Sequence, residues 1–197
     1  LNFGSGTDLA QLAMQSAVSN RVALRTTHTS TGDNNPFIIY QPSSAGVQND
    51  ALVVQTAGQI NMGKQPSFCA RLNSYPAMDI TTVPFETVVH NVGNHYSNST
   101  YRFTAPVAGR YYLSYSVRVN HGTSGHIIHP VFFINGSSDT TSRTIYRNDT
   151  GGQYMATTFS YVRQLSANDY VTVNMSSSSS GGTMQTGQCS FTGHLLG

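Results

Sequence analysis

The sequence predicts an all-β sandwich, and two observations carry this prediction. After residue 66, short segments rich in β-branched and aromatic residues recur roughly every 8 to 14 residues, with turn-forming residues between them. In the stretch YRFTAPVAGRYYLSYSVRV, residues 101–119, aromatic and apolar residues alternate with polar ones on both sides of a Pro-Val-Ala-Gly turn. Many short alternating strands of this kind are typical of a sandwich or a barrel.

The first 65 residues predict a separate, stem-like region with a short helix and short strands. Asp8 can cap a helix over LAQLAMQSAVSN. A weak apolar stripe runs along this segment through Leu9, Leu12, Ala13 and Met14. Such a helix is either a frayed linker or a trimerising stem. Turn clusters then separate three short predicted strands, at residues 21–25, 37–40 and 51–55.

Residues 66–197 predict a single β domain. Its expected strands are residues 68–71, 87–92, 101–104, 110–120, 127–134, 144–147, 154–164, 170–176 and 188–196. The Ser-rich stretch 176–182 predicts a loop before the last strand.

The strand 110–120 shows which of its faces is buried. Alternation places Tyr111, Leu113, Tyr115, Val117 and Val119 on one face, which we assign to the core. The opposite face carries Tyr112, Ser114, Ser116 and Arg118. An aromatic residue on a face that is otherwise polar indicates that another subunit covers it.

Composition excludes several classes of function. Apolar residues make up 38% of the chain and charged residues only 9%, where about 25% charged is usual. A polar, uncharged surface suits virion, extracellular or adhesin proteins. The net charge is +2 and the arginines stand singly, which argues against a nucleic-acid partner. No apolar run approaches the roughly 20 residues that a membrane-inserted helix needs.

The sequence carries no pattern typical of an enzyme. There is no G-x-S-x-G nucleophile motif, and the acidic residues are scattered among turns rather than paired. We therefore expect a non-enzymatic protein that requires no cofactor.

One cluster of histidines raises the question of a metal. The stretch HGTSGHIIH brings His121, His126 and His129 close together in sequence. A threefold axis would triple any one of them, and three imidazoles can hold a transition metal. The alternative is an exposed loop with polar tips.

The motif F-T-A-P-V-A-G-R-Y-Y-L-S-Y, residues 103–115, resembles the signature of complement C1q-like globular heads. Further matches follow the family's order over about residues 66–197. They are Phe68 and Ala70; Phe85, Val88, Asn91 and Tyr96; Phe133, Asn135 and Gly136; Leu165 with Asn168 to Val171; and F-T-G-H-L-L at residues 191–196. Asn168 departs from the family's usual glycine, and residues 127–147 match only loosely.

The resemblance implies a ten-stranded jelly-roll sandwich, related to tumour-necrosis-factor-like ligands, that forms a homotrimer. By strand parity, four residues then face the threefold axis: Tyr112, Ser114, His194 and Leu196. Tyr111, Leu113, Phe191 and Leu195 lie in the core. The resemblance also allows calcium or another metal ion, with Asp139 and Asp149 as candidate ligands.

Parity also bears on the two cysteines. Phe68 and Ala70 are expected to face the core, so Cys69 faces away from it, whereas Cys189 shares the core face with Phe191. We therefore predict two free thiols.

A second resemblance concerns the leader. Residues 50–68, DALVVQTAGQINMGKQPSF, are similar to segments that join shaft to head in bacteriophage tail fibres. The leading hypothesis is a trimeric virion fibre or spike head that binds a host-cell surface glycan or protein receptor. Its N-terminal region would contact other virion proteins. The alternatives are a secreted C1q-like recognition head and a virion decoration or capsid fibre with a stabilising role.

If binding is the function, exposed loops at the far end of the trimer are expected to carry it. The candidate loops are residues 120–126, 135–143 and 176–187. Their candidate ligand-binding residues are Asn120, His121, His126, Asn135, Ser137, Asp139 and Arg143.

Overall fold

The computed structural model describes residues 9–15, 21–27, 37–42, 48–55, 57–77, 81–122, 124–177 and 182–197. The chain divides into two compact units, Leu1–Lys64 and Gln65–Gly197. In the described residues, no helix is long and apolar enough to cross a membrane.

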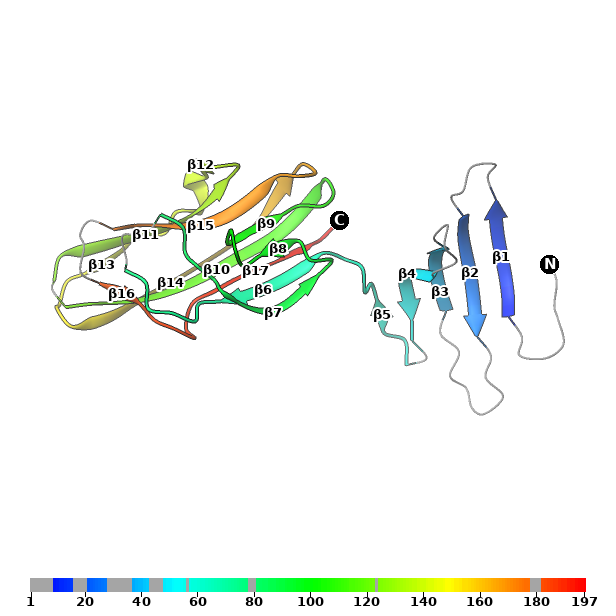
Figure 1. Ribbon diagram of the computed structural model, residues 1–197, viewed down its shortest axis with the longest axis horizontal. Helices are drawn as coiled ribbons and strands as arrows, with labels where there is room; N and C mark the ends of the chain where they lie inside the picture. The colour runs from blue at the N-terminus through cyan, green and yellow to red at the C-terminus, as the bar shows by residue number, and fades with distance from the viewer. Residues whose placement is uncertain are drawn as a thin grey trace. The chain divides into compact units, whose positions relative to one another are not determined.

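The first unit is an antiparallel sheet, sheet A, in which the strands follow one another in chain order (Figure 1). Its strands are β1 (Leu9–Gln15), β2 (Arg21–Thr27), β3 (Phe37–Pro42), β4 (Gln48–Val54) and β5 (Ile60–Asn61).

The helix predicted from residue 9 onward is wrong, because Leu9–Gln15 is a strand. It pairs along its whole length with β2, from Leu9 opposite Thr27 to Gln15 opposite Arg21. A single helix of about 12 residues is marginal in water, and the stripe that predicted it was weak. The neighbouring β-prone segment offers every residue of β1 a cross-strand partner, so strand pairing prevails.

The second unit is a sandwich of two antiparallel sheets (Figure 1). Sheet B has the strand order β14-β10-β17-β6-β7, with β16 also pairing with β10. The bounds are β6 (Ser67–Arg71), β7 (Thr87–Val92), β10 (Gly109–His121), β14 (Gln153–Leu165), β16 (Thr183–Met184) and β17 (Ser190–Leu195).

Sheet C has the order β12-β11-β15-β9-β8, with β13 also pairing with β11. Its strands are β8 (Tyr96–Ser97), β9 (Arg102–Thr104), β11 (His126–Ile134), β12 (Ser137–Ser138), β13 (Tyr146–Asn148) and β15 (Tyr170–Ser177). A 3-10 turn, η1 (Thr140–Ser142), lies between β12 and β13. The all-β sandwich is thereby confirmed. Residues 178–181 of the predicted Ser-rich loop lie outside the described residues.

The core lies between sheets B and C and is rich in aromatic rings. Phe191 of β17 meets Phe68 of β6 edge to face, with ring centroids 4.7 Å apart. It also contacts Phe132 of β11, at 5.7 Å, so it joins the two sheets. The five residues of β10 assigned to the core are all fully buried: Tyr111, Leu113, Tyr115, Val117 and Val119. Leu195 is partly buried and packs against the same cluster.

The turn that contains Asn168 is hydrogen-bonded to the residue that precedes the Pro-Val-Ala-Gly turn. Ala105, before the Pro-Val-Ala-Gly turn, donates its N–H to the carbonyl of Asp169 and accepts from Asn168. Asn168 has a φ of 71°, a left-handed conformation that Asn tolerates better than most non-glycine residues. The departure from the family's glycine is therefore compatible with the same turn.

Both cysteines are free, as predicted. Cys69 is half-buried, whereas Cys189 is buried among core residues. Burial raises the pKa of the Cys189 thiol, and hydrogen bonds with the backbone of Arg118 and Gln185 only partly oppose this. Cys189 is therefore a core residue with little thiolate character.

Candidate functional site

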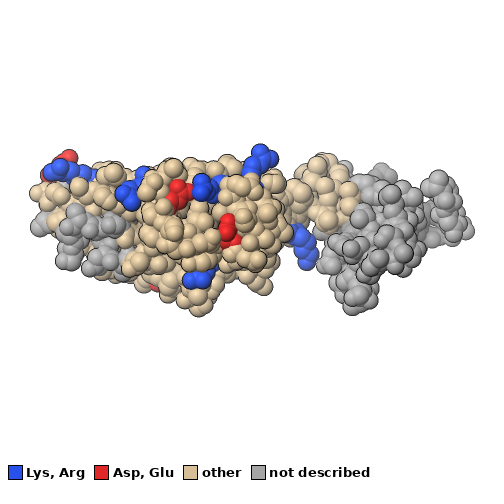
Figure 2. All heavy atoms as spheres, turned by 90° about the horizontal axis from the view of Figure 1, so that it is seen from above, with Lys and Arg blue, Asp and Glu red and all other residues tan. Residues whose placement is uncertain are grey.

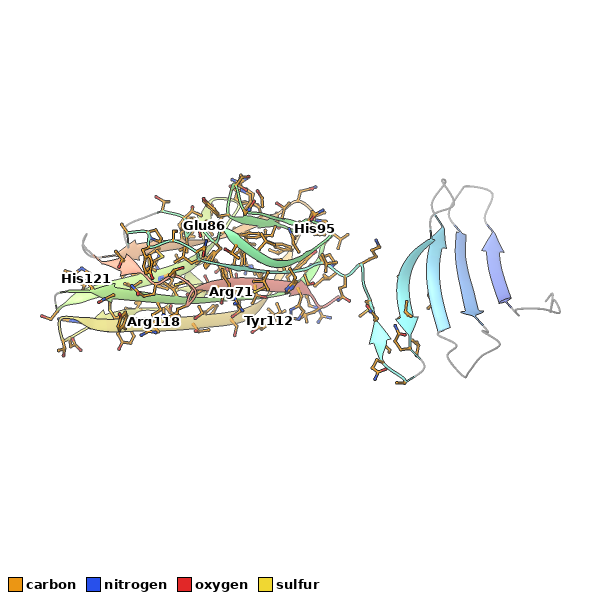
Figure 3. All side chains as sticks on the ribbon, turned by 60° about the horizontal axis from the view of Figure 1, so that its bottom comes forward. Arg71, Glu86, His95, Tyr112, Arg118 and His121 are labelled. Atoms are coloured by element: carbon orange, nitrogen blue, oxygen red, sulfur yellow. The ribbon has the colours of Figure 1, made fainter. Side chains whose placement is uncertain are left out.

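The outer face of sheet B, which turns away from the core, carries the residues that parity assigned to a subunit contact. Along β10, buried residues alternate with partly exposed ones. The partly exposed set runs from Tyr112 near the Gly109 end of the strand to Asn120 near the His121 end. Tyr112 and Arg118 mark the two halves of this face (Figure 3).

Near the Gly109 end, the outer face carries a cluster of aromatic and apolar side chains beside the exposed Arg110. Tyr112 lies between His194 of β17 and Val162 of β14 in the strand register. The rings of Tyr112 and His194 are 5.2 Å apart. Val162 is 53% exposed, and Leu196, just after β17, is 48% exposed. We call Tyr112, Val162, His194 and Leu196 the Tyr112 patch.

A band of small hydroxyl residues follows the Tyr112 patch. Ser114 lies opposite Thr192 on one side and Ser160 on the other. Cys69 of β6 continues the same row beyond Thr192. This part of the face therefore has little bulk and no charge, so another chain can approach it closely.

Charge on this sheet has one sign. The strands of sheet B contain Arg71, Arg110, Arg118 and Arg163 but no Asp or Glu. Charged side chains are also sparse elsewhere on the second unit, where most of the visible surface is uncharged (Figure 2).

His121 and His126 come together, as their spacing in the sequence allows. Their ring centroids are 3.6 Å apart, and His121 is only 4% exposed on the core side of β10. Desolvation, together with the neighbouring His121, lowers the pKa of His126. At this centroid distance the two rings lie against each other. Two imidazoles that hold one metal point their nitrogens at a shared centre instead.

The other candidate metal ligands lie elsewhere. His129 is opposite Ser176 on sheet C, Asp149 pairs with Arg147 at 3.1 Å, and Asp139 has its own partners. Across the described part of the chain, no three His, Cys, Asp or Glu side chains are placed to hold a metal ion. Within one subunit, the five predicted ligands therefore do not fit a metal or calcium site.

The candidate binding loops do not gather at one end of the subunit. Asn120, His121 and His126 lie at the His121 end of β10. Asn135 follows Ile134 at the opposite end of β11 and bonds to Asp169, with Nδ2 to Oδ1 at 2.8 Å. The loops 120–126 and 135–143 flank β11, so they lie at its opposite ends. The sequence analysis expected them at the same end of the trimer and did not take this into account. Ser137 begins β12, two residues after Asn135. Asp139 and Arg143 flank η1.

Asp139 is a structural residue of this segment. Its Oδ1 accepts hydrogen bonds from Thr141 N (3.2 Å) and Thr141 Oγ1 (2.6 Å), and its Oδ2 accepts one from Tyr161 Oη (3.0 Å). Arg163 Nε lies 3.7 Å from Oδ2. Burial alone would raise the pKa of Asp139, but these hydrogen bonds and Arg163 hold it below its ordinary value.

Asp139→Asn is expected to lower the free energy of unfolding by about 1–2 kcal/mol near neutral pH, because the charged hydrogen bonds weaken. A carboxyl whose pKa is lowered by folding stabilises the fold above its ordinary pKa, and this stabilisation is lost as pH falls through the lowered value. Urea unfolding of both proteins, at roughly pH 7 and about pH 2, should show the difference shrinking at the lower pH. A difference independent of pH would contradict this role.

Two arginines that the sequence analysis did not select are stacked on tyrosines. The guanidinium carbon of Arg118 lies 4.2 Å from the ring centroid of Tyr154, and that of Arg102 lies 4.2 Å from the centroid of Tyr170. Parity had placed Arg118 on the outer face. Its partner depends on the register between β10 and β14, which alternation alone does not specify.

Residues 67–196 match the family model of the C1q domain. Among solved structures, the globular domain of a zebrafish complement 1qA protein is 14% identical, covers 68% of this chain and 98% of its own, and has a TM-score of 0.49. Murine APRIL is 16% identical, covers 68% of this chain and 100% of its own, and has a TM-score of 0.53. At this identity the likeness to APRIL shows the fold alone. No curated protein matches the sequence.

Proposed function

The chain belongs to the C1q domain family. From this premise we propose that it forms the head of a homotrimeric fibre or spike, which attaches a virion to a receptor on the host-cell surface. We propose that this receptor is a glycan. The observation that carries the proposal is the Tyr112 patch. It places an aromatic ring and two half-exposed aliphatic side chains together on an open sheet face. Apolar surface of this kind marks an interaction site.

A second copy of the same chain is the partner that this face fits. The face has no carboxylate to attract a basic partner, and its centre is lined by hydroxyl residues such as Ser114 and Thr192. Cyclic symmetry would bring three equivalent faces to one axis, as the family resemblance implies. In this arrangement Tyr112, Ser114, His194 and Leu196 become buried between subunits.

The setting in a virion rests on the leader and on composition. Residues 50–68 resemble the shaft-to-head segments of phage fibres, and only 9% of residues are charged. We propose that residues 1–65 contact other virion proteins and that the head is non-enzymatic and extracellular. A secreted recognition head and a stabilising virion decoration are the alternatives. A measurement of binding to host cells separates the receptor-binding fibre head from the stabilising decoration.

The oligomeric state is the direct test. Light scattering on the full chain is expected to give a mass of three subunits. A chelator is expected to leave this mass unchanged, because the contact proposed at the Tyr112 patch is apolar and needs no metal. A trimer that dissociates in chelator would replace the apolar contact with a metal shared between subunits. A stable monomer would overturn the assignment of the Tyr112 patch to a subunit contact.

A further inference from the structure

Arg102 of β9 is a half-buried cation for which the fold supplies no anion. Its guanidinium carbon lies 4.2 Å from the centroid of the Tyr170 ring. Among the buried side-chain nitrogen and oxygen atoms of the described residues, Arg102 Nε alone has no hydrogen-bond partner. Arg102 also takes part in neither of the two ion pairs of these residues. A charge that loses water without gaining a partner costs free energy, and a bound anion would recover part of this cost.

The surroundings of Arg102 offer no free carboxylate. The strands of sheet C contain no Asp or Glu. Asp169, which directly precedes β15, uses both of its carboxylate oxygens within its own turn. Its Oδ1 accepts a hydrogen bond from Asn135 Nδ2 at 2.8 Å, and its Oδ2 accepts one from Ser166 N at 2.7 Å. The anion that would pair with Arg102 therefore has to come from outside the chain.

Strand β15 presents polar groups on the outer face of sheet C, which turns away from the core. Its odd-numbered residues from 171 to 175 belong to the core cluster, so alternation directs Tyr170, Thr172 and Asn174 outward. Thr172 and Asn174 are each only 7% exposed, because neighbouring side chains shelter them. Thr172 Oγ1 donates a hydrogen bond to Asn174 Oδ1 at 2.8 Å. This bond fixes the amide and leaves its N–H2 group as a donor.

The strands on either side of β15 complete this surface. Phe103 of β9 pairs with Val171, so Arg102 comes beside Thr172 in the same antiparallel register. On the other side of β15, Phe133 of β11 pairs with Thr172. Phe133 is half-buried. A stacked guanidinium, a fixed amide and an aromatic ring thus share one face of the sheet.

We infer that this surface binds a sugar that carries a carboxylate. We call it the Arg102 patch: Arg102, Phe133, Tyr170, Thr172 and Asn174. A guanidinium offers a planar pair of donors that matches a carboxylate, and one cation balances one such group. Amides and hydroxyls supply directional hydrogen bonds to sugar hydroxyls, while aromatic rings supply apolar surface. The inference rests on the proposed role of the head in glycan binding.

The Arg102 patch and the Tyr112 patch lie on opposite sides of the sandwich. Sheets B and C are its two layers (Figure 1), and the Tyr112 patch is on the outer face of sheet B. A contact between subunits through that face leaves the outer face of sheet C directed away from the neighbouring subunit. A trimer then presents three Arg102 patches, so weak binding to one sugar residue becomes stronger on a surface with many.

The test compares two sugars that differ in one group. Methyl β-glucuronide has a carboxylate where methyl β-glucoside has a hydroxymethyl group. Both are titrated into the full chain, and binding is followed by ligand-observed NMR. The glucuronide is expected to bind about tenfold more tightly, as a charge-assisted pair of hydrogen bonds predicts. A tetraglutamate peptide is titrated in parallel, because a protein carboxylate is the competing source of the anion.

Three variants locate the site. Arg102→Gln is expected to remove the preference for the glucuronide, about a tenfold loss, and to leave weak glucoside binding unchanged. Arg102→Lys keeps the charge but not the planar pair of donors, so an intermediate loss is expected. Arg147→Gln is the matched control, because it removes an arginine of the same sheet that already pairs with Asp149 at 3.1 Å. Its affinity for the glucuronide is expected to equal that of the wild type.

Several outcomes would overturn the inference. These are equal affinity for the two sugars, a glucuronide preference that survives in Arg102→Gln, an equal loss in Arg147→Gln, and tighter binding of the peptide than of the glucuronide. Circular dichroism of each variant is expected to match the wild type, so that lost binding does not reflect unfolding.

Light scattering on the same samples keeps the Arg102 patch apart from the oligomeric state. A trimer that does not distinguish the sugars contradicts the Arg102 patch alone. A monomer that does distinguish them contradicts the proposed trimer alone.

Discussion

Replacing Val162 with glutamate is expected to convert the proposed trimer into monomers, so that the mass measured by light scattering falls threefold. Val162 lies beside Tyr112 in the register of β14 and β10 and is 53% exposed in the single subunit. Folding therefore tolerates the new side chain, whereas association would bring three like charges to one axis and remove them from water. Such juxtaposition costs several kcal/mol, on the order of what a modest interface provides.

Val107→Glu is the matched control, because it adds the same charge to a valine that is 46% exposed in the β9–β10 turn, off the sheet face. Its mass is expected to stay that of the wild type. Circular dichroism should show that both variants are folded. Cys69, half-buried on the outer face, should react faster with iodoacetamide in the Val162 variant than in the wild type. A trimeric Val162→Glu protein would place the subunit contact elsewhere.

Replacing Phe191 with alanine is expected to lower the free energy of unfolding by about 3–5 kcal/mol, the usual cost of deleting a buried phenyl ring. Phe191 is fully buried and contacts the rings of Phe68 in sheet B and of Tyr96 and Phe132 in sheet C. It also contacts the ring of Phe85, which lies just before β7. Residues of both sheets would therefore have to move to fill the cavity that the missing ring leaves. Urea unfolding of the full chain, followed by circular dichroism, measures the loss.

The control for Phe191 is Ile145→Ala. Ile145 is 66% exposed, so its truncation is expected to change stability by less than about 0.5 kcal/mol. A loss near that small value for Phe191→Ala would mean that the aromatic cluster does not join the sheets as described.

Alternation predicted much of the second unit because each strand buries one face. On β10, five of the even-numbered positions are partly exposed and every odd-numbered position is buried, since one side of the strand meets sheet C and the other does not. The same rule separated Cys69 from Cys189 and predicted two free thiols. It also placed Tyr112, Ser114 and His194 on a common face, although it could not show what covers that face.

Other features followed from contacts distant in sequence. Short segments such as Tyr96–Ser97 and Thr183–Met184 form strands because a partner strand lies beside each of them, β9 for the first and β10 for the second. Leu9–Gln15 became a strand rather than a helix because β2 was available as a partner. Local propensity is weak in such segments, so the neighbouring strand decides their conformation.

The sequence by itself determined the fold class, the inward and outward faces of the main strands and the state of the cysteines, because these depend on the two-residue period of a strand. The tertiary structure alone decided which residues meet across strands. It placed Asn135 and His126 at opposite ends of β11, gave Asp139 to Thr141, Tyr161 and Arg163, and put Arg118 over Tyr154. Register and strand order set these contacts, and neither is encoded in the period of a single segment.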